Sequence, residues 1–291
     1  GQGYINIPLS DNLAVRAVFY NYDTPGFIDN LGTGTQDINS EEVTGGRVAL
    51  RWDISDSATF NLLYLNQTSR VGGGNGNNLQ TPTSTYTPVT DNSIPSDIGS
   101  PDLENPSFRS NDDPFRERDF EVLNLKLDVG FETFDFSVMS ATKQRKIFSQ
   151  WDVGLWFGIY DDVTVSLTKE DSQFEANTFE MRLVSTGDGP IDWIAGVWYE
   201  KEDGDIVAPI LVKTPRTDLT SFGVPIGDGD LLFDREDFDD QEELSVYGEV
   251  GYRFTDKAKL TLGYRRADLK LDSGILRADG VFGGGSRATI G

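Results

Sequence analysis

The sequence predicts an all-β fold, an antiparallel up-and-down sheet that forms part of a transmembrane β-barrel. Three observations predict it: apolar and polar residues alternate along most segments, short polar turns join these segments in pairs, and long loops separate the pairs. A period of two gives a strand one apolar and one polar face. Long loops on one side only are typical of outer-membrane barrels. We expect about ten strands with short periplasmic turns and long extracellular loops.

The strands are justified by the alternation itself. From Leu123 to Phe131 every odd position is apolar, and every even position is polar, charged or glycine. A strand of this kind buries one face and leaves the other wet. The same alternation recurs in Arg47–Ile54, Leu244–Phe254 and Lys257–Asp272.

Several of these segments are long for strands. Strands in globular proteins have about five or six residues, whereas a strand that crosses a membrane needs about nine to eleven. The segments Leu13–Tyr22, Glu42–Ile54 and Glu236–Phe254 reach the longer range. Their length favours a membrane barrel.

The connections fall into two classes. Tight polar turns, typical of hairpins, are expected at Ser10–Asn12, Ser55–Ser57, Glu132–Thr133, Gly187–Pro190 and Thr255–Asp256. Long loops are expected over Leu31–Asn39, Val71–Arg116, Asp152–Thr164 and Gly204–Glu236. Aromatic residues that could form a ring at one membrane interface lie within a few residues of the tight turns: Trp52, Phe60, Phe131, Phe134, Trp193, Tyr252 and Phe254.

Composition excludes several classes of function. The 291 residues include 25 Lys and Arg against 48 Asp and Glu, a formal charge of −23, with no Cys and no His. Disulfides, thiol nucleophiles, Ser-His-Asp catalysis and the commonest zinc ligand are therefore excluded. The acidity argues against a nucleic-acid partner. Composition does not exclude glycoside hydrolysis by a pair of carboxylates, since 48 acidic residues offer many pairs, but nothing in the sequence selects one pair. We expect no enzyme activity, no cofactor and no metal site.

The acidic segment Asp234–Glu243 is interpreted as a solvated loop at a loop-to-strand junction, because it lacks the spacing and the turn glycine of a calcium loop. The segment Gly227–Asp230 is interpreted as a turn. The glycines of Gly72–Gly76 lack the Lys-Ser/Thr ending of a phosphate-binding loop, and no helix follows them.

Both ends of the sequence are interpreted as cut. No Met or signal peptide opens the chain, and the glycine-rich segment Ala278–Ser286 follows the last strong strand without a closing one. No apolar run is long enough for a membrane helix. We therefore expect an internal piece of a longer protein.

Several segments, in order, resemble TonB-dependent outer-membrane receptors. Asn6–Arg16 followed by Gly26–Asn30 resembles their opening barrel strands, and Gly45–Asp56 resembles the next hairpin. Phe179–Ser185 with Trp193–Tyr199 resembles a later hairpin, and Leu260–Arg265 is similar to a strand near mid-barrel. The resemblance extends over nearly the whole chain.

The resemblance implies a barrel of about 22 strands whose lumen holds a plug domain. Residues 1–291 would be the N-terminal half of that barrel, without the plug and without the C-terminal strands. It implies energy-coupled uptake of a bulky scarce nutrient, most often a ferric siderophore, at the bacterial outer membrane. Further partners would be outer-membrane lipid and a periplasmic TonB-type energy transducer, reached through the missing N-terminal region.

A set of charged residues is expected on the polar, lumen-facing side of the strands. They could contact the plug or steer a charged substrate, or they could be mutually paired charges on a wet wall. The candidates are Arg47, Arg51, Glu180, Arg182, Glu249, Arg253 and Arg265.

Two alternatives to an energy-coupled receptor remain open. A passive porin-type channel would share the barrel but lack the plug. A soluble all-β domain that binds or cleaves glycans would have the same alternation, because a sandwich also buries one face of each strand. The sandwich would stack two sheets around a dry centre, whereas a barrel wall is a single sheet thick.

Overall fold

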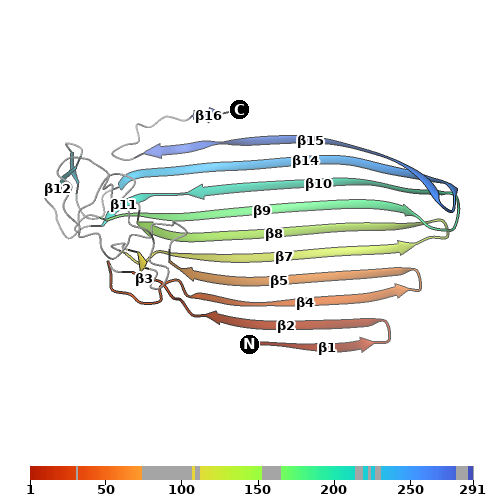
Figure 1. Ribbon diagram of the computed structural model, residues 1–291, viewed down its shortest axis with the longest axis horizontal. Helices are drawn as coiled ribbons and strands as arrows, with labels where there is room; N and C mark the ends of the chain where they lie inside the picture. The colour runs from red at the N-terminus through yellow and green to blue at the C-terminus, as the bar shows by residue number, and fades with distance from the viewer. Residues whose placement is uncertain are drawn as a thin grey trace.

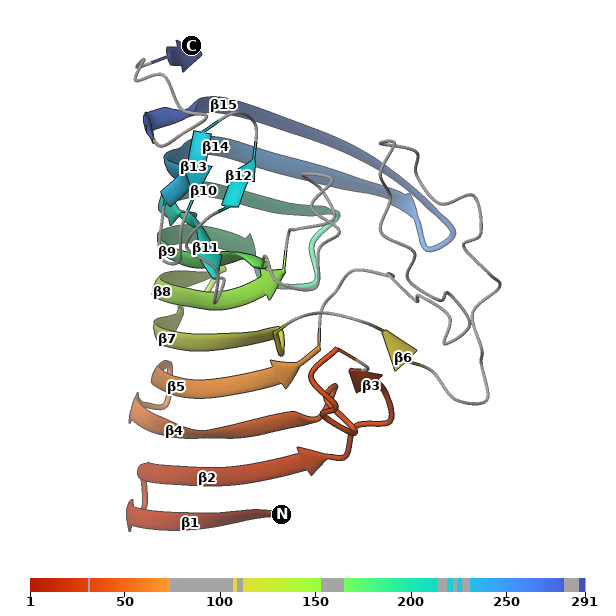
Figure 2. The same ribbon diagram turned by 90° about the vertical axis from the view of Figure 1, so that its left-hand side faces the viewer.

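In a computed structural model the chain forms one long, curved sheet that is a single layer thick (Figures 1 and 2). The structure describes residues 1–30, 32–73, 107–108, 112–152, 165–213, 219–221, 224–226, 231–279 and 288–290. The long strands are β1 (Gln2–Ser10), β2 (Leu13–Thr24), β4 (Glu41–Ser55), β5 (Ala58–Gly72), β7 (Phe115–Gly130), β8 (Phe134–Asp152), β9 (Val165–Ser185), β10 (Ile191–Val207), β14 (Leu231–Thr255) and β15 (Ala258–Asp279).

Neighbours in the sheet are also neighbours in the sequence, and every pair is antiparallel. The order is β1-β2-β4-β5-β7-β8-β9-β10-β14-β15, which confirms the expected up-and-down topology. The sheet has 12 strands when it is counted with the short β11 (Ile210–Lys213) and β16 (Ala288–Ile290). Over the described residues the sheet does not close on itself.

The short strands outside this order lie on the loop side. β3 (Asp29–Asn30) pairs in parallel with β6 (Ser107–Phe108), and β12 (Leu219–Ser221) pairs with β13 (Val224–Ile226). They belong to the long connections, which gather at one end of the strands (Figure 1).

Each tight turn lies where the alternation places it. The shortest connections are Asp11–Asn12, Asp56–Ser57 and Asp256–Lys257, and all the tight turns lie at the end opposite the loops (Figure 1). Most of the expected loops 71–116 and 152–164, and the expected turn Gly227–Asp230, lie outside the described residues. One-sided loop length is thus confirmed by the strand boundaries.

One expected loop is wrong in its extent. The segment Gly204–Glu236 contains the end of β10 and the start of β14, and β11 continues β10 past Pro209 between β9 and β14. The backbone ladder holds across the proline, since the amide of Lys169 donates to the Pro209 carbonyl at 3.2 Å.

The acidic segment Asp234–Glu243 was also misplaced by the sequence analysis. It is not a loop but lies within β14, where it pairs with both β10 and β15. Loop-like composition misled the prediction, because a strand that stands in water tolerates charge on both faces.

The apolar face of the sheet carries a continuous band across all the long strands. Register places its members on one face, and many are exposed, such as Leu262 at 70% and Val250 at 53%. Representative residues, one from each strand, are Ile7, Val15, Val48, Leu62, Leu125, Val138, Met181, Val197, Val246 and Leu262. We call this the apolar band.

The apolar band ends sharply on the loop side. The next residues on the same face are Asn21, Thr44, Asn66, Glu121, Thr142, Asn177, Lys201, Glu242 and Arg266. Aromatic residues lie at both margins: Trp52, Phe60, Trp193 and Tyr252 near the turns, and Phe19, Tyr64, Phe179, Tyr199 and Tyr264 near the loops. From Trp193 to Tyr199 the strand rises about 20 Å at ~3.3 Å per residue. That height approaches the ~25 Å apolar belt of membrane barrels.

A second sheet does not cover this face. Among the described residues, only Ile38, Ala141 and Ala176 are buried hydrophobic residues. A sandwich buries an apolar core between its layers, and this sheet has no such core over the described ranges. In those ranges no helix has the length and hydrophobicity needed to cross a membrane.

Candidate functional site

The face opposite the apolar band carries the predicted site residues, and we call it the charged face. Strand register places all of them on this one face of the sheet. For example, Arg182 lies opposite Gly196, and Gly196 lies opposite Tyr247, which in turn lies opposite Arg265. Opposite residues of neighbouring strands share a face, and so do residues two apart in one strand.

Two of the predicted arginines are paired with acids. Arg265 lies 2.6 Å from Glu243 and donates to Ser245 at 3.1 Å, while Arg51 lies 3.0 Å from Asp53. Both arginine side chains are more than half exposed, 61% and 64%. Exposed pairs of this kind contribute about 0–1 kcal/mol to stability.

Glu180 is bound by a tyrosine. The hydroxyl of Tyr247 donates to Glu180 Oε1 at 2.7 Å. The ring of Tyr247 lies flat over Gly196, where a Cβ would approach the ring within 2.3 Å. The glycine therefore leaves the space that lets Tyr247 lie along the wall and reach two strands across to Glu180.

The remaining predicted residues have fewer contacts. The Nε of Arg182 is buried and has no hydrogen-bond partner. Over the described ranges, Arg47, Glu249 and Arg253 form no ion pair. The charged face is thus partly paired and partly free. Register places Arg47 on β4 and Arg265 on β15 on the same face, but seven strand-to-strand steps separate them, so the structure does not bring them together.

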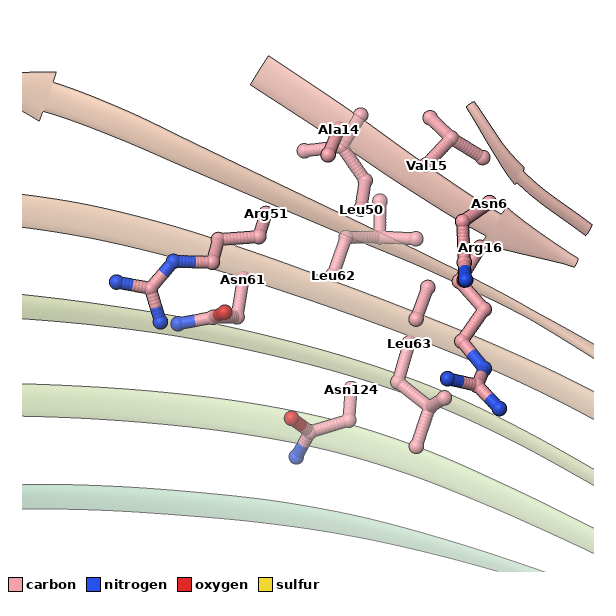
Figure 3. A pocket seen from close by; sticks show the side chains of 11 residues that line it. Asn6, Ala14, Val15, Arg16, Leu50, Arg51, Asn61, Leu62, Leu63 and Asn124 are labelled. Carbon is pink, nitrogen blue, oxygen red and sulfur yellow. The ribbon is translucent and has the colours of Figure 1, made fainter. Parts of the chain in front are cut away.

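An open hollow of about 350 Å³ lies on the charged face of β1, β2, β4, β5 and β7 (Figure 3). The short side chains of Ala14 and Ala49 contribute to it, while Arg16 and Arg51 reach into its sides. Amides border it as well: Asn6, Asn61 and Asn124. Donors and acceptors surrounding small apolar side chains suit contact with polar backbone or polar side chains.

A second feature of the charged face is a strip of cations on the loop side. Arg116 and Arg118 on β7 and Lys143 and Arg145 on β8 occupy four successive positions along the charged face, from the pair Arg116–Ser149 to the pair Val122–Lys143. Register sets Arg118 opposite Ile147, and Arg145 opposite Phe120, so the two arginines are diagonal neighbours. We call these four residues the cationic strip.

Acidic partners for the cationic strip are scarce. In the described part of the chain, Arg116, Arg118 and Arg145 form no ion pair, and Lys143 lies 3.9 Å from Glu200. The Nε of Arg116 is buried without a hydrogen-bond partner. Diagonal neighbours are about 8 Å apart, so each pair of like charges costs about 0.5 kcal/mol even in bulk water.

The sequence analysis missed the cationic strip. Arg116 was expected at the end of the long loop 71–116, whereas it lies within β7. The available signal was the spacing of the cations by two residues on each strand, which puts each pair on one face. The cross-strand register that joins the two pairs could not be read from the sequence.

A folded loop packs at the same end of the sheet. Residues 25–30 and 32–40 are held by Asp113, whose carboxylate accepts hydrogen bonds from Thr33 and Thr35 at 2.6 Å and from the fully buried Asn30 at 2.9 Å. Ile38 packs so closely on Gly72 that a Cβ there would meet the Ile38 carbonyl oxygen at 1.9 Å. We call this segment the rim loop.

No metal centre is found over the described ranges, where no three acidic side chains come together in a way that could hold an ion. The acidic stretch of β14 instead points alternately to the two faces of its strand.

No family model matches the sequence, and no curated protein matches it. Solved structures do match. The ferric yersiniabactin uptake receptor FyuA from Yersinia pestis has a TM-score of 0.73 at 14% identity, over 99% of this chain and 40% of that one. The ferripyoverdine receptor of the Pseudomonas aeruginosa outer membrane has a TM-score of 0.62 at 15% identity, over 99% and 36%.

The ferric citrate transporter FecA in its unliganded form also matches, with a TM-score of 0.52 at 12% identity, over 99% of this chain and 39% of that one. The chain thus spans 36–40% of the length of these proteins. Its fold is that of part of the barrel of TonB-dependent siderophore receptors, which confirms the resemblance seen in the sequence.

Proposed function

We propose that this chain is the N-terminal half of the barrel of a TonB-dependent receptor that takes up a ferric siderophore across the bacterial outer membrane. The observation that carries the proposal is the single-layer sheet whose apolar band is exposed and bounded by aromatic residues on both margins. Hydrocarbon is the medium that suits such a face, because a water-exposed band of this size would aggregate.

On this proposal the charged face lines the lumen. Arg47, Arg51, Arg182, Arg253 and Arg265, with Glu180 and Glu249, then face the interior, where a plug domain outside this chain would be seated. The hollow between Arg16 and Arg51, mostly apolar inside and bordered by amides, is suited to contact with that plug. The energy transducer would act through the plug rather than through this wall.

Uptake needs no covalent chemistry from the chain. The long loops would bind the ferric complex outside the cell, and movement of the plug would open a path through the lumen. The protein is therefore proposed as a transporter and not as an enzyme. Support comes from the likeness in fold to uptake receptors for ferric complexes.

The alternatives differ from this proposal in ways that can be measured. A soluble glycan-binding sandwich requires a second layer, and the described sheet is a single layer (Figure 2). A passive channel shares the sheet, but its flux would need neither an energy transducer nor a proton gradient.

The test uses the host bacterium with the gene deleted and restored. Under iron limitation we expect the deletion to abolish growth on one ferric siderophore, and the restored gene to recover growth and saturable uptake of radioactive iron. Uptake should stop when the transducer is deleted or the proton gradient is collapsed. Membrane fractionation should place the protein in the outer membrane.

Some results would reject the proposal. Uptake that persists without the transducer, and that rises linearly with substrate concentration, would favour the passive channel. Recovery of the whole protein in the soluble periplasmic fraction would favour the glycan-binding domain.

A further inference from the structure

Two aromatic side chains lie next to the cationic strip. On one rung of the ladder, Arg145 lies between Phe120 on β7 and Phe174 on β9. The guanidinium of Arg145 stacks 4.3 Å above the centre of the Phe174 ring. A cation fixed on an aromatic ring keeps its hydrogen-bonding edge free for another group.

A glycine on the next strand makes room for the Phe174 ring. Phe174 lies against Gly204 on β10, where a Cβ would come within 2.8 Å of the ring. Phe120 remains 37% exposed on the other side of Arg145. Arg145 thus covers one side of the Phe174 ring and Gly204 lies against it, so the exposed ring at this position is that of Phe120, with the Arg145 guanidinium on the neighbouring strand.

The positive charge of the cationic strip contrasts with the negative charge of the chain as a whole. The chain carries a formal charge of −23, and yet the cationic strip holds four neighbouring cations. The nearest acid on the charged face of β9 is Glu170, which accepts a hydrogen bond from Ser172 at 2.8 Å. On β10 the acids of this face are Glu200 and Glu202, which lie nearer the turns than the position of Arg145, and only Glu200 approaches the strip, at 3.9 Å from Lys143.

The arginines of the cationic strip lie toward the loop ends of their strands. On β7 the apolar band ends at Leu123, so Arg118 and Arg116 lie about 16 and 23 Å further toward the loops at ~3.3 Å per residue. The three arginines of the cationic strip therefore lie beyond the apolar band, toward the loop ends of β7 and β8.

From these observations we propose that the cationic strip with Phe120 and Phe174 is a binding site for a polyanionic ligand that bears planar aryl groups. Guanidinium groups would bind the anionic oxygens in bidentate fashion, the exposed ring of Phe120 would stack on an aryl group, and Phe174 would hold Arg145 in place. This inference rests on the proposed function, and it restricts the substrate to anionic, aryl-bearing chelates rather than neutral ones.

The test uses the full-length receptor purified in detergent, with three probes. One probe is a trianionic ferric tris-catecholate, the second is a neutral ferric tris-hydroxamate, and the third is iron-free inorganic tripolyphosphate. The variant is Arg118→Gln/Arg145→Gln. A matched control, Arg266→Gln/Lys270→Gln, removes two exposed cations on the opposite face of the sheet, each paired with an acid.

We expect the Kd for the tris-catecholate to rise about tenfold or more in the variant, with a shallower salt dependence, since charge-assisted contacts are lost. The control should bind like the wild type. Arg118→Lys/Arg145→Lys should keep tripolyphosphate binding and lose part of the tris-catecholate affinity, because an ammonium lacks the planar fork. A folding defect of the Gln variant would instead weaken the binding of all three probes by that variant alike, while the control still binds them normally.

The inference is overturned if the Gln variant binds both anions like the wild type, or if its binding of a neutral chelate falls by the same factor. If the receptor takes up only the neutral chelate, the proposed function stands and this inference fails. If tripolyphosphate binds through the strip but no ferric complex binds, the strip is an anion site and the iron function fails.

Discussion

A cationic residue placed on each face of the same strand separates the lipid-facing from the lumen-facing side. Val138 lies in the apolar band on β8, between Leu127 on β7 and Met181 on β9. Met139, the next residue, lies on the charged face opposite Lys126 and Glu180. We predict that Val138→Arg destabilises the protein strongly and that Met139→Arg does not.

The expected loss of stability in Val138→Arg follows from the position of Val138 in the middle of the apolar band. Val138 is in the middle of the band on β8, with Phe136 below it and Ser140 above it on the same face. Arginine at the midplane of a barrel's lipid face costs about 2–4 kcal/mol, and about 0–1 kcal/mol near the interfaces. Since each 1.4 kcal/mol is a factor of ten, Val138→Arg should lower the folding constant by roughly 30- to 700-fold.

A control on the same face tests depth separately. Gln144 lies six residues from Val138 on β8, about 20 Å toward the loops at ~3.3 Å per residue, beside Glu121 and Glu175. Gln144→Arg should change the free energy of unfolding by about 1 kcal/mol or less, because an exposed charge gains little from acidic neighbours.

The assay is reversible folding of the full-length receptor into lipid vesicles, followed by tryptophan fluorescence across a denaturant titration. If Met139→Arg is the damaging change and Val138→Arg is tolerated, the two faces have been assigned the wrong way round. If all three variants fold equally well, the sheet does not face lipid at all.

Three further predictions concern single contacts. Gly196→Ala should cost about 1–3 kcal/mol because its Cβ would clash with the Tyr247 ring at 2.3 Å, whereas Gly263→Ala, where the nearest atom is 3.7 Å away, should be close to neutral in thermal unfolding. Asp113→Ala should speed amide exchange in the rim loop about tenfold or more without moving the global transition, since it removes the acceptor of Thr33, Thr35 and Asn30; unchanged exchange would refute the anchor. Arg265→Met should cost no more than about 1 kcal/mol by denaturant titration, since its ion pair with Glu243 is largely exposed, and a loss above 3 kcal/mol would show that it holds the wall together.

The strands and their two faces could be predicted because each depends on the alternation of apolar and polar residues within one short segment. Alternation from Leu123 onward fixes both the strand and its face, and each antiparallel neighbour inherits the same division. For that reason, charged residues as distant as Arg47 and Arg265 could be assigned to one face from parity alone. That this face lines a lumen stays a prediction.

The parts that could not be predicted depend on what lies beside a strand. The acids from Asp234 onward suggest a loop, but β10 and β15 supply the hydrogen bonds that keep them extended. The same limit hid the neighbouring positions of Arg118 and Arg145, since nothing in either strand specifies which rung of the other it faces. The close contact between Gly196 and Tyr247 could not be predicted either, because it also depends on the register between two strands.

The order of the strands has a consequence for how the wall is assembled. Each long strand pairs with the one that precedes it in the chain, so each new pairing closes only the loop between two successive strands. Low contact order of this kind lets successive hairpins add to a growing edge without a distant segment having to arrive first. The costliest closure is then the one between β5 and β7, which more than 40 residues separate, and folding should slow at that step.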